Sequence, residues 1–108
     1  LDNKIAPTNY RFVMAKGYEY QGQPIVVSEY GGFKLAGTEG WGYDGEAKDA
    51  EDLVRKYDEI TSAYKKMEKV CGFCYTQLTD VYHETNGLMS FDRTPKVPLK
   101  EIKKINER

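Results

Sequence analysis

The sequence predicts an α/β fold in which two parallel strands are connected through a helix. Two short runs rich in strand-forming residues, 24–30 and 70–78, flank a stretch, 49–69, whose apolar residues recur every three or four positions. A second helix is predicted over 98–107, so the order is strand, helix, strand, helix. A strand that returns through a helix is a βαβ unit, and we therefore expect parallel pairing with a right-handed crossover.

The first strand, "PIVVSEY", is short, β-branched and apolar on both faces, as in a buried parallel sheet. Gly22 and Pro24 mark a turn before it. Glu29 lies at its carboxyl end, where a charge is costly unless it is exposed at a site or paired. The segment that follows, 31–46, has six glycines in sixteen residues and predicts a long loop, a common location for function.

The helix over 49–69 has a start signal and one apolar side. Asp49 is a suitable N-cap, and Asp52 suits the positive end of the helix dipole. The spacing predicts about five turns that pack one face on the core. The residues expected on that face are Leu53, Val54, Tyr57, Ile60, Tyr64 and Met67.

The second strand, 70–78, leads into another long loop, in which Asn86 and Gly87 supply turn chemistry. Asp80 is expected to order this loop. Pro98 suits the first position of the final helix. The buried side of that helix is predicted from three apolar residues, Leu99, Ile102 and Ile105.

Cys71 and Cys74 form a C-x-x-C pair within the second predicted strand. A redox pair needs its first cysteine at a helix N-terminus, whereas strand geometry turns these side chains to opposite faces. A structural zinc site needs four ligands, and the chain offers two cysteines and one histidine, His83. We therefore expect buried free thiols, no metal and no cofactor, with a slight preference for a reducing, cytoplasmic compartment.

Composition excludes several classes of partner. The 108 residues carry 16 basic and 17 acidic side chains, a net charge of -1, which gives no electrostatic basis for binding nucleic acid or an anionic membrane. No apolar run approaches the roughly 18 residues of a membrane helix. Nine Tyr, four Phe and one Trp are compatible with a carbohydrate site, because aromatic rings form platforms for sugars.

Two strands are too few for an independently stable parallel sheet. Their outer edges would be open, and we expect the chain to self-associate through them. The pattern therefore indicates one part of a larger α/β fold, such as a (β/α)₈ barrel, which takes about 250 residues. Both long loops would leave the carboxyl ends of parallel strands, where α/β proteins place their sites.

Two motifs then carry a resemblance to a known family. "GQPIVVSEYGG" resembles the seventh barrel strand of glycoside hydrolase family 2, and "GFCYTQLTDVYHETNGLMSFDRTPK" resembles the eighth strand with its following loop. The resemblance runs from Gly22 to the end of the chain. It implies that residues 1–108 are the C-terminal segment of a catalytic TIM barrel, the last quarter of a β-galactosidase-, β-glucuronidase- or β-mannosidase-like domain.

The resemblance implies a retaining β-glycosidase in which Glu29 is the catalytic nucleophile. That chemistry needs a second, protonated carboxyl group about 5–5.5 Å away. The family supplies it as a glutamate after the fourth strand, usually in an Asn-Glu pair, and the 108 residues do not include that strand. We therefore expect the isolated chain to be inactive.

Further substrate contacts are predicted in the two loops and strand ends. Tyr75 stands where many family members have a tryptophan that lines the sugar site, and Tyr30 follows the nucleophile directly. Trp41 is equally suited to be a stacking platform or a loop anchor, and His83 either contacts substrate or is solvated. The alternative is a non-catalytic α/β module that binds carbohydrate or a protein partner through its aromatic loops.

Overall fold

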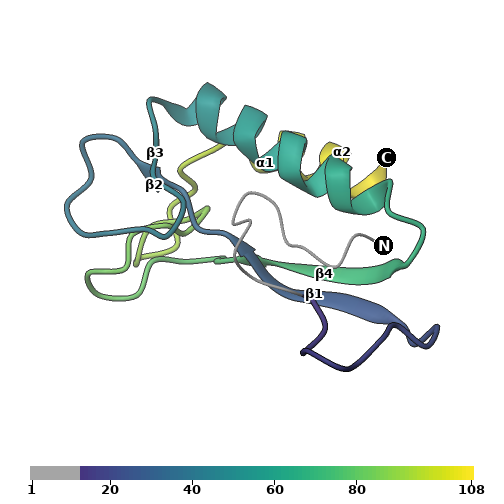
Figure 1. The fold of residues 1–108 in the computed structure, drawn as a ribbon. Coiled ribbons are helices and arrows are strands. Elements are labelled where there is room, and N and C mark those ends of the chain that lie inside the picture. The colour runs from purple at the N-terminus through teal and green to yellow at the C-terminus, as the bar shows by residue number, and fades with distance from the viewer. Residues whose placement is uncertain (1–12) are drawn as a thin grey trace.

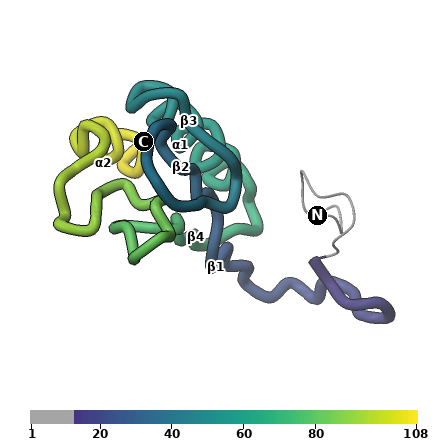
Figure 2. The backbone as a smooth tube through the Cα atoms, turned by 90° about the vertical axis from the view of Figure 1, so that its left-hand side faces the viewer, coloured from purple at the N-terminus to yellow at the C-terminus, as the bar shows by residue number. Residues whose placement is uncertain are grey.

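The computed structural model describes residues 13–108 as a small mixed α/β unit with two layers. Both views place two helices on one side of a parallel two-stranded sheet (Figure 1, Figure 2). A two-stranded ribbon of much shorter strands lies within the glycine-rich segment. The elements are β1 (Ile25–Gly31), β2 (Lys34–Leu35), β3 (Glu46–Ala47), α1 (Ala50–Lys65), β4 (Val70–Thr76) and α2 (Leu99–Glu107).

The predicted parallel pairing is confirmed. β1 and β4 pair in parallel, with Val27 opposite Phe73 and Tyr30 opposite Tyr75. The register shifts between Val27 and Tyr30, so β1 carries a bulge immediately before its carboxyl end. This irregularity falls at Ser28 and Glu29, and it changes the alternation of side chains where the charged residue lies.

The sheet has one covered and one open face. On the helix side the Tyr30 ring contacts the rings of Phe73 and Tyr75, and it also meets Tyr64 of α1, with centroids 5.0 Å apart. Val26, on the other face, is 60% exposed. For the described residues the prediction of strands buried on both faces is therefore wrong, because both helices lie on the same side of the sheet.

The open face also corrects the prediction for the cysteines. Cys71 and Cys74 are free thiols, as expected, but both are exposed rather than buried. Cys74 lies on the face that neither α1 nor α2 covers, two residues from Gly72, whose position adjoins Val26. The Cys71 thiol donates a hydrogen bond to the carbonyl oxygen of Ile25, 3.3 Å away.

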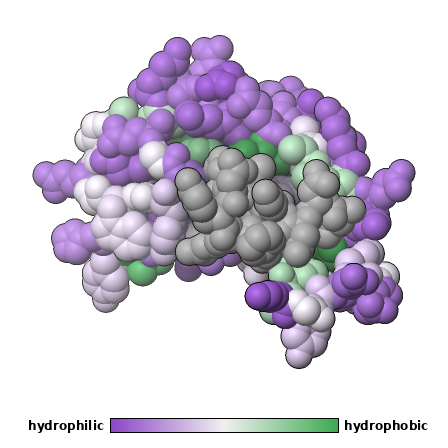
Figure 3. Space-filling view, viewed as in Figure 1, coloured by the Kyte–Doolittle hydropathy of each residue, from purple (hydrophilic) through white to green (hydrophobic). Residues whose placement is uncertain are grey.

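Helix α1 begins as predicted and ends early. The Asp49 carboxylate accepts a 2.8 Å hydrogen bond from the Asp52 backbone N–H, which satisfies an otherwise unpaired helix donor. The helix ends at Lys65, so Met67 lies beyond it and is 44% exposed instead of buried. The outward surface of α1 is mostly hydrophilic and hydrophobic atoms lie beneath it, as expected of an amphipathic helix (Figure 3).

The core lies where α1 and α2 meet the glycine-rich segment and the second long loop. Leu53 and Tyr57 are buried as predicted, and so are Ile102 and Ile105 of α2. Leu99 is 39% exposed instead, because α2 starts there and Pro98 is its N-cap rather than its first residue. The buried cluster is Phe33, Ala47, Leu53, Tyr57, Leu88, Val97, Ile102 and Ile105.

The glycine-rich segment is partly regular, which the sequence did not predict. β2 and β3 pair in parallel, and Lys34 bonds both to the Thr38 carbonyl at 2.8 Å and to Glu46 at 2.9 Å. This small ribbon closes the long loop on itself. Neither helix in the described part of the chain is long and apolar enough to cross a membrane.

Gly31 ends β1 in a conformation that suits glycine. Its φ is +84°, and a Cβ there would overlap the Tyr75 ring. We expect Gly31→Ala to destabilise the fold by about 2–4 kcal/mol, from left-handed strain plus overpacking. Urea unfolding measures this. Gly37→Ala is the control, because Gly37 has a similar φ of +79° with nothing near its Cβ position, and an equal loss in both variants would contradict the packing argument.

Candidate functional site

Glu29 lies at the carboxyl end of β1 with its side chain exposed. Within residues 13–108, no hydrogen bond or ion pair engages its carboxylate. The interpretation of Glu29 as half of a structural ion pair therefore has no support in the described part of the chain. An exposed, ionisable group at the end of a parallel strand is where an α/β fold presents reactive side chains.

The two long loops that follow β1 and β4 are joined by backbone hydrogen bonds. The Trp41 backbone N–H donates to the His83 carbonyl at 2.8 Å, and the Thr85 N–H donates to the Trp41 carbonyl at 2.9 Å. Gly40 permits this approach, because a Cβ at that position would overlap the His83 carbonyl oxygen. The loops leave the same end of the sheet (Figure 1), and these bonds hold them together.

Trp41 acts as a loop anchor, one of the two roles that the sequence suggests for it. Its backbone anchors one loop to the other, while its ring stays 47% exposed. The ring meets Tyr43 edge to face, with centroids 5.1 Å apart. We call Trp41 and Tyr43 the aromatic corner.

Tyr43 is a site residue that the sequence reasoning missed. Its N–H donates to the Gly32 carbonyl at 2.8 Å, which holds it against the end of β1, and its ring is largely exposed. Partial desolvation raises the pKa of Tyr43, and the carboxylates of Glu84 and Glu29 raise it further. Both carboxylates thus lie within electrostatic reach of the Tyr43 hydroxyl. The repeated aromatic residue in "GWGYDG" is the signal that could have identified it.

Tyr30 and His83 lie differently from what a direct contact requires. The Tyr30 side chain is buried under α1, and its hydroxyl shares a 2.7 Å hydrogen bond with the Thr61 hydroxyl. Burial raises the pKa of Tyr30 well above its ordinary value. In this geometry Tyr30 packs the sheet rather than facing a ligand. His83 is exposed, and its backbone carbonyl, not its ring, makes the contact with Trp41.

Tyr75 is neither fully buried like Tyr30 nor exposed like His83. Its ring packs on Tyr30, Tyr57 and Gly31, and its buried hydroxyl has no hydrogen-bond partner. Burial raises the pKa of Tyr75 to about 12, and the nearby backbone N–H groups of Phe33 and Gly32, which do not reach hydrogen-bond geometry, offset this only in part. The phenol therefore stays protonated at neutral pH, as an unused donor under the end of β1.

Removing the hydroxyl of Tyr30 and removing that of Tyr75 should have opposite effects on stability. Tyr30→Phe should cost about 1 kcal/mol or more, because it leaves the buried Thr61 hydroxyl unpaired. Tyr75→Phe should be neutral or slightly stabilising, because it removes a buried polar atom that has no partner. Chemical denaturation of both variants checks this, and a clear loss for Tyr75→Phe would mean that its hydroxyl does find a partner.

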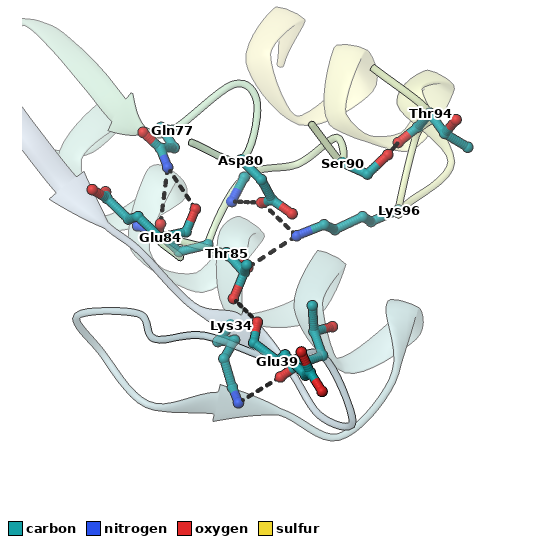
Figure 4. A network of polar contacts seen from close by, with 12 residues as sticks. Lys34, Glu39, Gln77, Asp80, Glu84, Thr85, Ser90, Thr94 and Lys96 are labelled. Carbon is teal, nitrogen blue, oxygen red and sulfur yellow. Dashed lines mark hydrogen bonds and ion pairs between the residues drawn. The ribbon is translucent and has the colours of Figure 1, made fainter. Parts of the chain in front are cut away.

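A buried ion pair stabilises the second long loop. Lys96 Nζ lies 2.6 Å from Asp80 Oδ1, and the two side chains are only 9% and 6% exposed (Figure 4). Asp80 also accepts the Gly87 N–H at 2.8 Å, and Lys96 donates to the Thr85 carbonyl at 2.9 Å. The prediction that Asp80 orders this loop is confirmed.

Asn86 is fully buried in the same network. Its side-chain oxygen accepts a 3.0 Å hydrogen bond from Gln77. The same Gln77 amide donates to the Glu84 carbonyl at 3.4 Å (Figure 4). These bonds fix the amide orientation, so Asn86 Nδ2 is directed at Gly32 and has no hydrogen-bond partner within residues 13–108. Residues 13–108 contain no group of three or more side chains suited to hold a metal ion.

Comparison with known proteins does not extend this description. No protein-family model matches the chain, and no curated protein matches its sequence. The site is therefore interpreted from its own geometry. That geometry provides an exposed carboxylate, an exposed aromatic corner and a second carboxylate, Glu84, at one edge of a parallel sheet.

Proposed function

We propose that this chain is the C-terminal quarter of a (β/α)₈ barrel that hydrolyses β-glycosides with retention, with Glu29 as the nucleophile. The observation that carries the proposal is the exposed Glu29 carboxylate at the carboxyl end of parallel β1, beside the aromatic corner. Barrel enzymes place their chemistry at this end of the strands. The sequence motifs around Glu29 and β4 add the resemblance to glycoside hydrolase family 2.

The chemistry runs in two steps. The Glu29 carboxylate attacks the anomeric carbon, and the glycosidic C–O bond breaks as a second carboxyl group gives its proton to the departing oxygen. The sugar is then bonded to Glu29 as an ester. Water, deprotonated by that second group, displaces Glu29 and restores both carboxyl groups. Inversion at each step gives net retention.

The open face of the sheet supports the larger barrel. Val26 and Cys74 lie uncovered on the side opposite the helices, which is the side that a barrel interior would fill. Tyr30 and Phe73 lie on the helix side, as barrel strands require. The remaining strands would supply the acid/base glutamate and most sugar contacts, so the 108 residues alone should not turn over substrate.

The test compares two polypeptides on aryl β-glycosides of glucose, galactose, mannose and glucuronate. One is the 108-residue chain, and the other carries the same residues together with the six preceding strands of the barrel. The longer polypeptide is expected to release the aryl group and to yield the β-anomer first by NMR. Turnover by the short chain, or first release of the α-anomer, would refute the proposal.

A second candidate is a binding module without catalysis. The half-exposed aromatic corner favours it, because two rings held by backbone bonds can bind a sugar without any acid/base pair. In that case glycan binding by the short chain would survive Glu29→Ala and be lost in Trp41→Ala. The longer polypeptide would then show no turnover.

We further propose that the isolated chain self-associates through its strand edges. In the described residues β1 pairs with β4 and with no other strand, so each keeps one unpaired edge. Sedimentation velocity should show dimers or larger species that grow with concentration. A single monomeric species at all concentrations would rule this out.

A further inference from the structure

The loop after β4 displays two large aromatic side chains away from the aromatic corner. Tyr82 is 83% exposed and Phe91 is 70% exposed. Their ring centroids lie 6.2 Å apart with a 45° tilt, so the rings form one bent apolar surface. Neither residue belongs to the core cluster.

The backbone at Tyr82 adopts an unfavourable conformation that leaves its side chain exposed. Its φ is +50°, in the left-handed region that aromatic residues rarely adopt. Val81 and Glu84 exchange two backbone hydrogen bonds, of 3.0 and 2.9 Å, and these close the turn that presents Tyr82 at its tip. Strain of this kind persists only where the surroundings fix it, and it concentrates at functional positions.

A second closed turn presents Phe91. Arg93 N–H donates to the Ser90 carbonyl at 2.8 Å, Ser90 N–H donates to the Thr94 carbonyl at 2.9 Å, and Arg93 has a φ of +67°. Tyr82 and Arg93 are the two non-glycine residues with positive φ in the described part of the chain. Both therefore lie in the turns that carry this ring pair.

Backbone hydrogen bonds join the segments from which the two turns begin. Asp80 N–H donates to the Met89 carbonyl at 2.9 Å, and Met89 N–H donates to the Leu78 carbonyl at 2.9 Å. Asp80 is also held by its buried ion pair with Lys96. Because these segments are fixed, the rings are pre-organised, and binding a ligand would lose little further conformational entropy.

We propose that Tyr82 and Phe91 form a second sugar-contacting surface, which takes a pyranose unit of an extended β-linked glycan. This inference rests on the proposed function and deepens it, because it makes the substrate an oligosaccharide or polysaccharide rather than a small glycoside. The C–H face of a pyranose packs on aromatic rings, while its hydroxyls need polar groups around them. Tyr82 supplies its own hydroxyl, and exposed His83, Asp92 and Arg93 supply the polar rim.

The position of the pair favours a glycan over another occupant. It lies on the loop that also carries His83 and Glu84, whose backbone is joined to Trp41 of the aromatic corner. A glycan that leaves the corner along this loop would meet the ring pair.

The test is calorimetric titration of the 108-residue chain with β-linked hexasaccharides of glucose, galactose and mannose, and with the three monosaccharides. We expect a hexasaccharide to bind more tightly than its monosaccharide. Tyr82→Ala and Phe91→Ala should each weaken hexasaccharide binding about tenfold, whereas Tyr82→Phe, which keeps the ring, should change it less than about threefold. Tyr18→Ala is the matched control, because Tyr18 is 73% exposed and lies outside the loop.

Glu29→Gln separates this inference from the proposed function. Hexasaccharide binding that persists in Glu29→Gln and falls in Tyr82→Ala supports the surface, whether or not the longer polypeptide hydrolyses glycosides. No binding by the chain, or equal binding by Tyr82→Ala and Phe91→Ala, overturns it. A change in sedimentation of these variants without a change in sugar binding would assign the pair to a protein contact instead.

Discussion

In the proposed barrel enzyme, Glu29→Gln should lower kcat/KM on aryl β-glycosides by about a thousandfold or more, with KM little changed. The amide has nearly the same shape but cannot form the ester to the anomeric carbon, so the loss falls on the chemical step. Because Glu29 is exposed and makes no hydrogen bond or ion pair within residues 13–108, the substitution should not disturb the fold. Steady-state kinetics with circular dichroism checks both statements.

Two further variants test whether the loss of activity is specific to Glu29. Glu84→Gln is the matched control, because Glu84 is the other carboxylate near Tyr43, and we expect it to cost less than about tenfold. In Glu29→Ala, added azide should restore release of the aryl group by attacking the vacated face, and the product should be the α-glycosyl azide. A Glu29→Gln enzyme with near-normal turnover, or an equal loss in Glu84→Gln, would exclude Glu29 as the nucleophile.

Lys96→Met should destabilise the chain by about 3–5 kcal/mol. The substitution removes the ammonium that lies 2.6 Å from Asp80 and leaves that carboxylate buried without its charged partner. The Thr85 carbonyl also loses its 2.9 Å donor. The midpoint of urea unfolding, followed by circular dichroism, measures the effect.

An exposed ion pair gives the matched control. Lys103 lies 3.6 Å from Glu107 on the outer side of α2, and both side chains are more than 60% exposed, so Lys103→Met should change stability by less than about 0.5 kcal/mol. The double variant Asp80→Leu, Lys96→Met should be more stable than Lys96→Met, because it removes the orphaned charge. Equal effects of Lys96→Met and Lys103→Met would show that the buried pair contributes no more to stability than the exposed pair.

The order and type of the main elements followed from local patterns. β-branched residues at 25–27 predicted β1, and the recurrence of Leu53, Tyr57 and Ile60 predicted α1. Asp49 was identified as the helix cap because an N-cap needs only its own carboxylate and a backbone N–H three residues away. These features depend on near neighbours in sequence, which is why they could be read without the fold.

Exposure and precise element ends were predicted less well. Met67 has the helical spacing of a core residue, yet the helix stops two residues earlier, so spacing no longer determines its direction. Val26 and Cys74 belong to apolar runs that resemble buried strands, but burial depends on what packs against each face. The residues described here provide helices for one face only.

The candidate site shows the same division. Glu29, Trp41 and His83 were identified from motifs and loop composition. Tyr43 was missed, because its place beside Glu29 depends on a hydrogen bond to Gly32, eleven positions away. Tyr30 adjoins Glu29 in sequence but is buried under α1, since neighbouring strand residues face opposite ways and a bulge intervenes.

The sequence by itself determined that this chain is α/β, that its strands run parallel, and that a lone carboxylate stands at the end of the first one. Periodicity, turn residues and the βαβ connection are local or topological rules, and they suffice for these conclusions. Only the tertiary structure decided which sheet face is open, which tyrosines reach solvent, and how the two loops join at Trp41 and His83. Those outcomes depend on contacts between separate segments, such as the Tyr30–Thr61 hydrogen bond across 31 positions, which no local pattern encodes.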